Sequence, residues 1–150
     1  MGYFTIINFN AYRCRNQQKI REIHDFIDGY EPNIIGIQEI YIVTAMVEFS
    51  GRYQVYFNIE NSSKDGIGIV TLVKHGIKVH DMIVGINGRI LGLCIENAQI
   101  WNVYPKSGTA FKKEREKFFR EELTELFIQW ENKTKQAGAE LGQAQPELGL

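Results

Sequence analysis

The stretch Asn33-Ile34-Ile35-Gly36-Ile37-Gln38-Glu39 decides how this 150-residue chain is interpreted. It begins as an uncharged apolar run, which is typical of a strand covered on both faces. A glutamine and a carboxylate follow the run, so we expect Glu39 at the C-terminal tip of a buried strand. In α/β proteins such a tip faces the crevice in which ligands bind. Glu39 is therefore a candidate site residue, although a glutamate that merely ends and solvates a strand fits the sequence equally well.

The residues before this stretch predict one strand and one helix. Residues 3–8 are β-branched and aromatic, which favours a strand. From about Asn16 apolar residues recur at helical spacing, and Asp28-Gly29 followed by Pro32 predicts the end of that helix. Strand, helix and strand in this order predict a parallel pair of strands with a right-handed crossover.

Asn8 stands at the tip of the first predicted strand, as Glu39 stands at the tip of the second. Carboxylate and amide oxygens suit Mg²⁺, which takes few protein ligands and keeps water molecules that substrate oxygens can replace. Together the two residues indicate a hard-cation site that faces a phosphate group.

The middle of the chain predicts a possible short helix and then a series of short strands. The helix would lie within residues 41–50, and Ile86-Asn87-Gly88-Arg89 is a typical hairpin turn. An apolar stripe at helical spacing predicts a further helix that ends near Trp130. The predicted strands are residues 53–57, 66–73, 77–84, 89–95 and 99–104.

Composition limits the classes of protein to which the chain can belong. A hydrophobic content of 44% and a length of 150 residues fit one globular domain. We assign residues 1–130 to this domain and residues 131–150 to a polar, disordered tail. The net charge of −1 excludes a general basic field that would hold nucleic acid. Two cysteines outside any metal-binding spacing, with no leader and no membrane segment, lead us to expect an intracellular protein, nuclear or cytoplasmic.

Several short pieces occur in an order that is more specific than any one of them. They are Ile7-Asn8-Phe9-Asn10, Pro32 to Glu39, Gly66-Ile67-Gly68-Ile69-Val70, Gly88-Arg89-Ile90-Leu91, Asn102-Val103-Tyr104-Pro105, and Arg115 with Phe118-Phe119. In this order they resemble the endonuclease/exonuclease/phosphatase superfamily. Within it, the closest match looks like the apurinic-endonuclease-like domain of non-LTR (LINE-type) retrotransposons.

The resemblance implies an α/β fold, the N-terminal half of a four-layered α/β sandwich (DNase I-like) with a mixed sheet and flanking helices. It gives Asn8 the amide that orients the site and contacts the scissile phosphate. Glu39 becomes the metal-binding carboxylate, and the Tyr104 hydroxyl points at the phosphate. Mg²⁺ is the implied cofactor and DNA the implied partner. The family usually reads Tyr-Ala-Pro, so Pro105 would turn the backbone one residue early.

The resemblance also implies catalytic groups that this chain does not contain. The family's second half supplies an Asp-x-Asn pair, a further aspartate and a Ser-Asp-His end, whereas here no aspartate follows Asp81 and no histidine follows His80. A general base must lie within hydrogen-bond reach of the attacking water. We therefore expect a truncated endonuclease-like domain that is inactive alone. One sheet should then expose an apolar inner face, which favours self-association.

Two other functions fit the same sequence. One is a phosphatase or sphingomyelinase-like member of the superfamily, which the pieces at residues 88–91 and 115–119 disfavour. The other is a non-enzymatic interaction module that uses the exposed sheet as its interface.

Overall fold

The computed structural model describes residues 3–13, 16–60, 66–96, 98–105 and 108–132. The chain divides into two compact units, Met1–Tyr104 and Pro105–Leu150, and each is described by itself. Within the described residues, no helix combines the length and the apolar character needed to cross a bilayer. Residues 133–150, which hold most of the predicted polar tail, lie outside the described residues.

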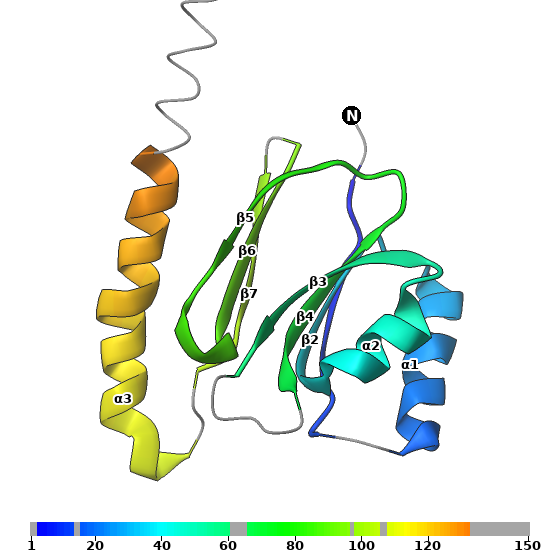
Figure 1. Ribbon diagram of the computed structural model, residues 1–150, viewed down its shortest axis with the longest axis horizontal. Coiled ribbons are helices and arrows are strands. Elements are labelled where there is room, and N and C mark those ends of the chain that lie inside the picture. Colours follow the sequence, from blue (N-terminus) through cyan, green and yellow to red (C-terminus); the bar gives the residue numbers. More distant parts are fainter. Residues whose placement is uncertain (1–2, 14–15, 61–65, 97, 106–107, 133–150) are drawn as a thin grey trace, which may run out of the picture. The chain divides into compact units, whose positions relative to one another are not determined.

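The first unit contains a mixed sheet of four strands in the order β1-β2-β4-β3 (Figure 1). Strands β1 (Ile6–Asn10) and β2 (Ile34–Tyr41) are parallel, and helix α1 (Gln17–Tyr30) connects them. This confirms the strand, helix and strand predicted from the sequence. Strand β4 (Ile67–Lys74) pairs antiparallel with β2 and with β3 (Tyr53–Ile59).

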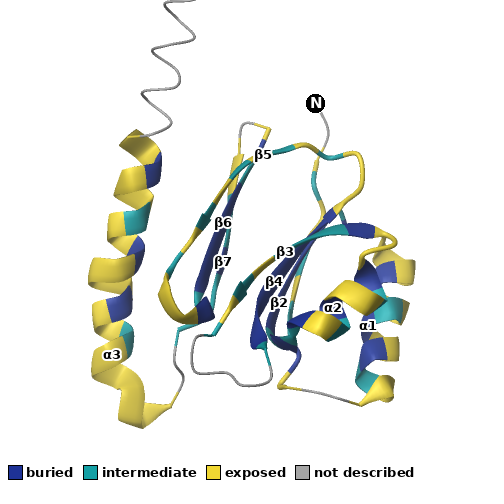
Figure 2. Cartoon of the chain, viewed as in Figure 1, coloured by how far each residue is buried: buried dark blue, intermediate teal, exposed yellow. Residues whose placement is uncertain are grey.

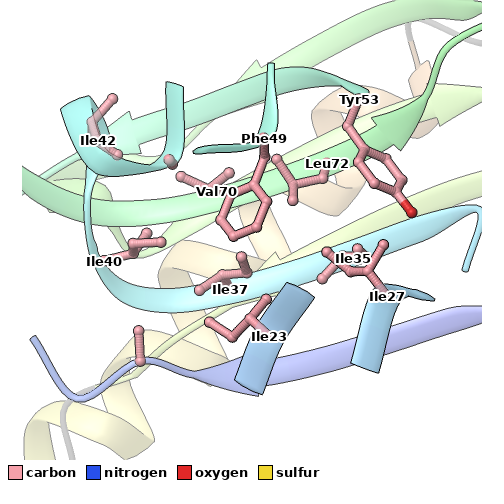
Figure 3. Packing of buried hydrophobic residues seen from close by; sticks show 12 residues of the cluster. Ile23, Ile27, Ile35, Ile37, Ile40, Ile42, Phe49, Tyr53, Val70 and Leu72 are labelled. Atoms are coloured by element: carbon pink, nitrogen blue, oxygen red, sulfur yellow. The ribbon is translucent and has the colours of Figure 1, made fainter. Parts of the chain in front are cut away.

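Helices α1 and α2 (Ile42–Phe49) lie against the outer face of this sheet, so that α2 confirms the possible helix in residues 41–50. A cluster of apolar side chains fills the space between the helices and the sheet (Figure 3). The Tyr53 hydroxyl donates to the Pro32 carbonyl oxygen at 3.0 Å, and burial raises the pKa of the Tyr53 phenol. The members of the cluster include Ile23, Ile27, Ile35, Ile37, Phe49, Val70 and Leu72.

Helix α1 begins as predicted but ends later. The Asn16 side chain accepts a hydrogen bond from the Gln18 N–H at 2.8 Å and caps the first turn. The predicted end at Asp28-Gly29 is wrong, because the helix continues to Tyr30. Glycine permits a helix end without forcing one, and the stacking of Tyr30 on Phe26, with ring centres 4.5 Å apart, favours the extension to Tyr30. Glu31 then adopts the left-handed conformation that ends the helix.

A second sheet of three antiparallel strands completes the first unit. It consists of β5 (Val79–Val84), β6 (Ile90–Ile95) and β7 (Ala98–Val103) in that order. The predicted hairpin turn joins β5 to β6, with Asn87 and Gly88 both at positive φ. Asparagine and glycine are the residues that adopt this conformation at least cost.

The two sheets cover each other at the centre of the unit. Figure 2 shows buried residues along β2, β4 and β6. The prediction that one sheet exposes its apolar inner face is therefore wrong for these strands. Among the described residues, apolar side chains are exposed at the margins of the inner faces, where Ile6, Met82 and Val84 are about half exposed. The residues buried between the sheets are Ile34, Ile69 and Val73 from the first, and Leu91, Leu93 and Ile95 from the second.

The second unit is helical over residues 112–132, which confirms the predicted helix. It begins with α3 (Lys112–Lys117) and continues as a π-helical segment, Phe118–Leu123. Phe119 and Phe127 of this helix are exposed.

Candidate functional site

Glu39 lies on a bulge inside β2, so the prediction that it marks the strand tip is wrong. The strand continues to Tyr41, and its register with β4 shifts between Ile37 and Ile40. Glu39 has a φ of 52°, a left-handed conformation that is uncommon for glutamate. Bulges change the direction of a side chain within a strand. Here the carboxylate is directed to one end of the sheet sandwich and is 21% exposed.

The segment that follows β1 supports this bulge. The Ala11 N–H donates to the Gln38 carbonyl oxygen and the Arg13 N–H donates to the Glu39 carbonyl oxygen, each at 2.8 Å. Both carbonyl groups of the bulge are thus hydrogen-bonded by residues that follow β1. These two hydrogen bonds join the loop after β1 to the bulge, although the two segments are far apart in the sequence.

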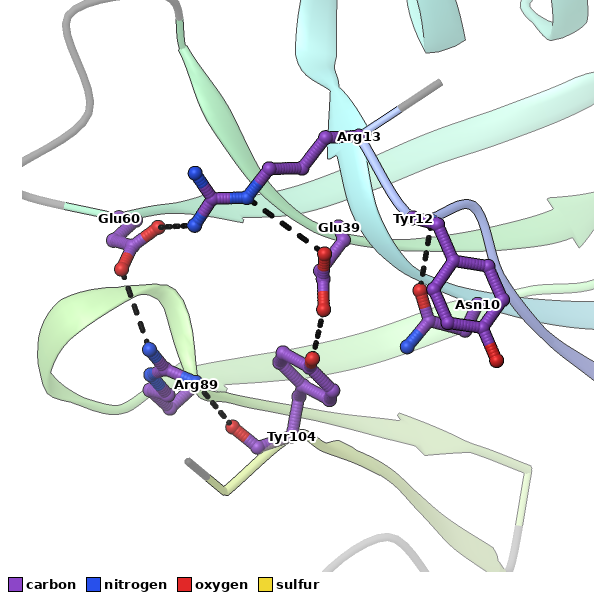
Figure 4. A network of polar contacts seen from close by, with 7 residues as sticks. All are labelled: Asn10, Tyr12, Arg13, Glu39, Glu60, Arg89 and Tyr104. Atoms are coloured by element: carbon purple, nitrogen blue, oxygen red, sulfur yellow. Dashed lines mark hydrogen bonds and ion pairs between the residues drawn. The ribbon is translucent and has the colours of Figure 1, made fainter. Parts of the chain in front are cut away.

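Tyr104 reaches Glu39 from the other sheet. It follows β7, its ring lies against the apolar layer between the sheets, and its hydroxyl donates to the Glu39 carboxylate (Figure 4). Pro105 follows directly, yet the hydroxyl is directed toward the predicted metal-binding residue. The structure therefore brings together two site residues that are 65 positions apart in the sequence.

Asn8 lies in the middle of β1 and not at its tip, because β1 extends to Asn10. The side chains of Asn8 and Gln38 form a reciprocal pair of amides. The Gln38 amide donates to Asn8 Oδ1 at 2.7 Å, and the Asn8 amide donates back at 3.3 Å. Asn8 thus contacts Gln38, the residue that precedes Glu39 in the sequence. The amide group of Asn8 is exposed, so it can still donate a hydrogen bond to a bound substrate.

A buried amide cluster connects this pair to the second sheet. Asn102 of β7 accepts a hydrogen bond from Gln38 Nε2 at 2.8 Å. The Asn102 amide donates to the Val70 carbonyl oxygen at 2.9 Å and to Thr71 Oγ1 at 3.3 Å. Gln38 and Asn102 are each only 6% exposed. Fully satisfied buried networks of this kind fix the relative position of the elements that they join.

Two arginines and a second glutamate surround the contact between Glu39 and Tyr104 (Figure 4). Arg13 lies 3.7 Å from Glu39 Oε2 and 3.9 Å from Glu60 Oε2. Arg89 lies 3.3 Å from Glu60 Oε1 and donates to the Tyr104 carbonyl oxygen at 3.2 Å. Arg13, Glu60 and Arg89 were not among the site residues expected from the sequence. The one available signal was the position of Arg89 within the Gly88-Arg89-Ile90-Leu91 piece.

The donor groups fit an open magnesium site with one carboxylate. Mg²⁺ is commonly bound through one or two carboxylates together with water and substrate oxygens, and Glu39 is a carboxylate of this kind. Asn8 is a weaker candidate ligand, because its amide oxygen already accepts from Gln38. In the part of the chain that the structure describes, no three His, Cys, Asp or Glu residues are grouped as a metal site.

Comparisons with known proteins show which solved structures have a similar fold. No protein-family model and no curated protein matches the sequence. Among solved structures, a humanized TDP2 from D. rerio that carries 14 mutations is similar over 78% of this chain, with a TM-score of 0.58 and 16% identity. A truncated TDP2 from Caenorhabditis elegans is similar over 73%, with a TM-score of 0.55 and 14% identity.

TDP2 is a member of the endonuclease/exonuclease/phosphatase superfamily and has the DNase I-like fold. The match covers 53% of the first structure and 49% of the second, so the chain spans about half the length of the structures that it matches. Their identities to this chain are low, so the likeness concerns the fold. The two sheets and flanking helices described here are therefore part of a DNase I-like α/β sandwich.

Proposed function

We propose that this chain carries the first half of a magnesium-dependent phosphodiesterase site that acts on DNA. The contact between the Tyr104 hydroxyl and the Glu39 carboxylate supports this most directly, because it joins the two sheets at a polar site. The amide pair of Asn8 and Gln38 lies beside that contact. DNA as substrate and a retrotransposon origin are finer proposals, which rest on the sequence pieces at residues 88–91 and 115–119.

Each of the three residues has a distinct role in this proposal. Glu39 holds Mg²⁺, which when bound neutralises charge on the phosphate group. Asn8 donates an amide N–H to a phosphate oxygen and orients the substrate. Tyr104 donates its one hydroxyl proton to Glu39 and, with substrate present, turns it to the phosphate instead. Donors placed in advance around developing charge are a major source of catalysis.

The 150-residue chain by itself should not cut DNA. After β7 its sequence offers neither an aspartate nor a histidine that could deprotonate the attacking water. Catalytic groups of this kind act as a unit, so a partial set loses nearly all of the rate enhancement.

Arg13, whose side chain is 58% exposed beside Glu39, provides local positive charge on a chain without a general basic field.

Removing the Glu39 carboxylate should weaken cation binding by about tenfold, which corresponds to roughly 1.4 kcal/mol. Mn²⁺ is a suitable probe, and its free concentration can be followed by electron paramagnetic resonance with Mg²⁺ as competitor. The matched control is Glu48→Gln, because Glu48 is a half-buried helix glutamate paired with His24 at a distance of 3.1 Å. Equal Mn²⁺ affinities for wild type, Glu39→Gln and Glu48→Gln would rule out Glu39 as the ligand.

Nicking of supercoiled plasmid in Mg²⁺ should proceed at the same background rate with wild type and with Glu39→Ala. The reason is that a bound cation and the two hydrogen-bond donors, Asn8 and Tyr104, cannot replace a general base that deprotonates the attacking water. Quantifying open-circular DNA over time measures this rate. A wild-type rate clearly above that of Glu39→Ala would disprove the predicted inactivity, while leaving the assignment of Glu39 intact.

A further inference from the structure

We propose that Arg89 is a positioning residue, which holds Tyr104 so that its hydroxyl meets the Glu39 carboxylate. The proposal deepens the function above, because Tyr104 acts there as a donor to phosphate. Arg89 itself would not touch substrate. Its side chain is only 16% exposed, and its contacts are with Tyr104 and Glu60.

The backbone at Arg89 is fixed by its attachment to β3. Gly88 has a φ of 65°, and a Cβ at this position would lie 2.5 Å from the Glu60 backbone nitrogen. The hairpin turn therefore lies directly against the end of β3. The Asn58 amide also donates to the Gly85 and Ile90 carbonyl oxygens, at 2.8 and 2.9 Å. Two sides of the turn are thus bound to the same strand.

From this fixed position Arg89 contacts Tyr104 in three ways. The Tyr104 N–H donates to the Arg89 carbonyl oxygen at 2.8 Å, and Arg89 Nη1 donates to the Tyr104 carbonyl oxygen at 3.2 Å. The guanidinium carbon lies 5.4 Å from the centre of the Tyr104 ring. A cation at this distance is attracted to an aromatic ring. The backbone and the ring of Tyr104 are therefore held by one residue.

Glu60 fixes the guanidinium in turn. One oxygen of Glu60 lies 3.3 Å from Arg89 Nη2, and the other lies 3.9 Å from Arg13. The planar guanidinium can contact Glu60 and the Tyr104 carbonyl oxygen simultaneously, with separate nitrogens. A lysine ammonium is a point charge on a flexible stem and cannot reproduce this fork. The geometry thus requires arginine and not only a positive charge.

The test measures the environment of Tyr104 directly. The full chain is labelled with 3-fluorotyrosine, and the fluorine resonance of Tyr104 is assigned with Tyr104→Phe. In Arg89→Met this resonance should move most of the way toward that of Tyr3, which is fully exposed. Arg89→Lys should restore only part of the wild-type position. The control Arg52→Met, which removes the ion pair with Asp28, should leave the resonance in place.

A second comparison separates positioning from a merely structural role. Glu39→Gln should shift the Tyr104 resonance in the wild-type background and have little effect in the Arg89→Met background, because the two groups would no longer meet. An unmoved Tyr104 resonance in Arg89→Met, or an undiminished response to Glu39→Gln, would overturn the proposal. If Arg89→Met fails to fold, the same Tyr104 resonance is measured in Glu60→Gln, which removes the charge that pairs with Arg89. None of these readouts uses a metal, so they stand whether or not Glu39 binds Mn²⁺.

Discussion

Replacing Asn102 by leucine should lower the free energy of unfolding by about 3 kcal/mol. Leucine has the same number and branching of side-chain heavy atoms, so most of the cost comes from polar groups that lose their partners. Asn102 accepts from Gln38 and donates to the Val70 carbonyl oxygen and to Thr71, all in buried surroundings. Each buried polar group left without a partner costs roughly 1–3 kcal/mol.

Urea unfolding followed by circular dichroism measures this loss from the midpoint and slope. Thr71→Val is the graded control, because it removes one acceptor of the cluster and should cost about 1 kcal/mol. Gln38 and Asn8 should also lose their mutual order in Asn102→Leu, which their side-chain amide resonances would report. A loss below about 1 kcal/mol would show that the amide cluster does not join the two sheets energetically.

Gly68→Ala should destabilise the chain by about 3 kcal/mol, at the upper end of the usual cost of overpacking. A Cβ at Gly68 would lie 2.0 Å from the Asn58 carbonyl oxygen and 2.9 Å from the Ile59 Cα. Both are backbone atoms of the neighbouring strand β3, so β3 and β4 would have to move apart. The same urea titration measures the effect.

Gly36→Ala is the matched control for this substitution. Its Cβ would lie 2.8 Å from Asn8 Oδ1, the end of an exposed side chain that can rotate away at the cost of its hydrogen bond from Gln38. The loss of stability should therefore be clearly smaller than for Gly68→Ala, although the Asn8 amide resonances should shift. Equal losses for the two variants would contradict the claim that backbone contact decides the cost.

The fold was largely predictable because its signals are local. The uncharged run at residues 34–37, the helical spacing in α1 and the Asn87-Gly88 turn each depend on neighbours in sequence. The end of α1 was misplaced because Gly29 only permits a helix to stop. The covering of the inner face was missed because it depends on Leu91 and Leu93 of the second sheet, which join Ile69 and Val73 of β4 in one buried cluster only after folding.

Three candidate site residues could be named from the sequence, but how they lie relative to one another could not. Glu39 and Asn8 came from their places in the predicted strands and from a resemblance to known sequences, and Tyr104 from that resemblance alone; both kinds of signal indicate positions and no distances. The bulge at Glu39 depends on hydrogen bonds from the loop after β1, and such bonds leave no sequence pattern. Arg13, Glu60 and Arg89 meet only after folding, since they come from three separate segments.

Because the backbone at Glu39 is left-handed, replacements that raise thermal stability at this position compete with keeping the carboxylate. A non-glycine residue in this conformation costs about 1 kcal/mol or more, and glycine would relieve that cost. The same replacement deletes the carboxylate that Tyr104 contacts. A library ranked only by melting temperature would therefore enrich chains without this carboxylate. Engineering of this scaffold needs a selection step that scores the proposed cation binding as well as heat tolerance.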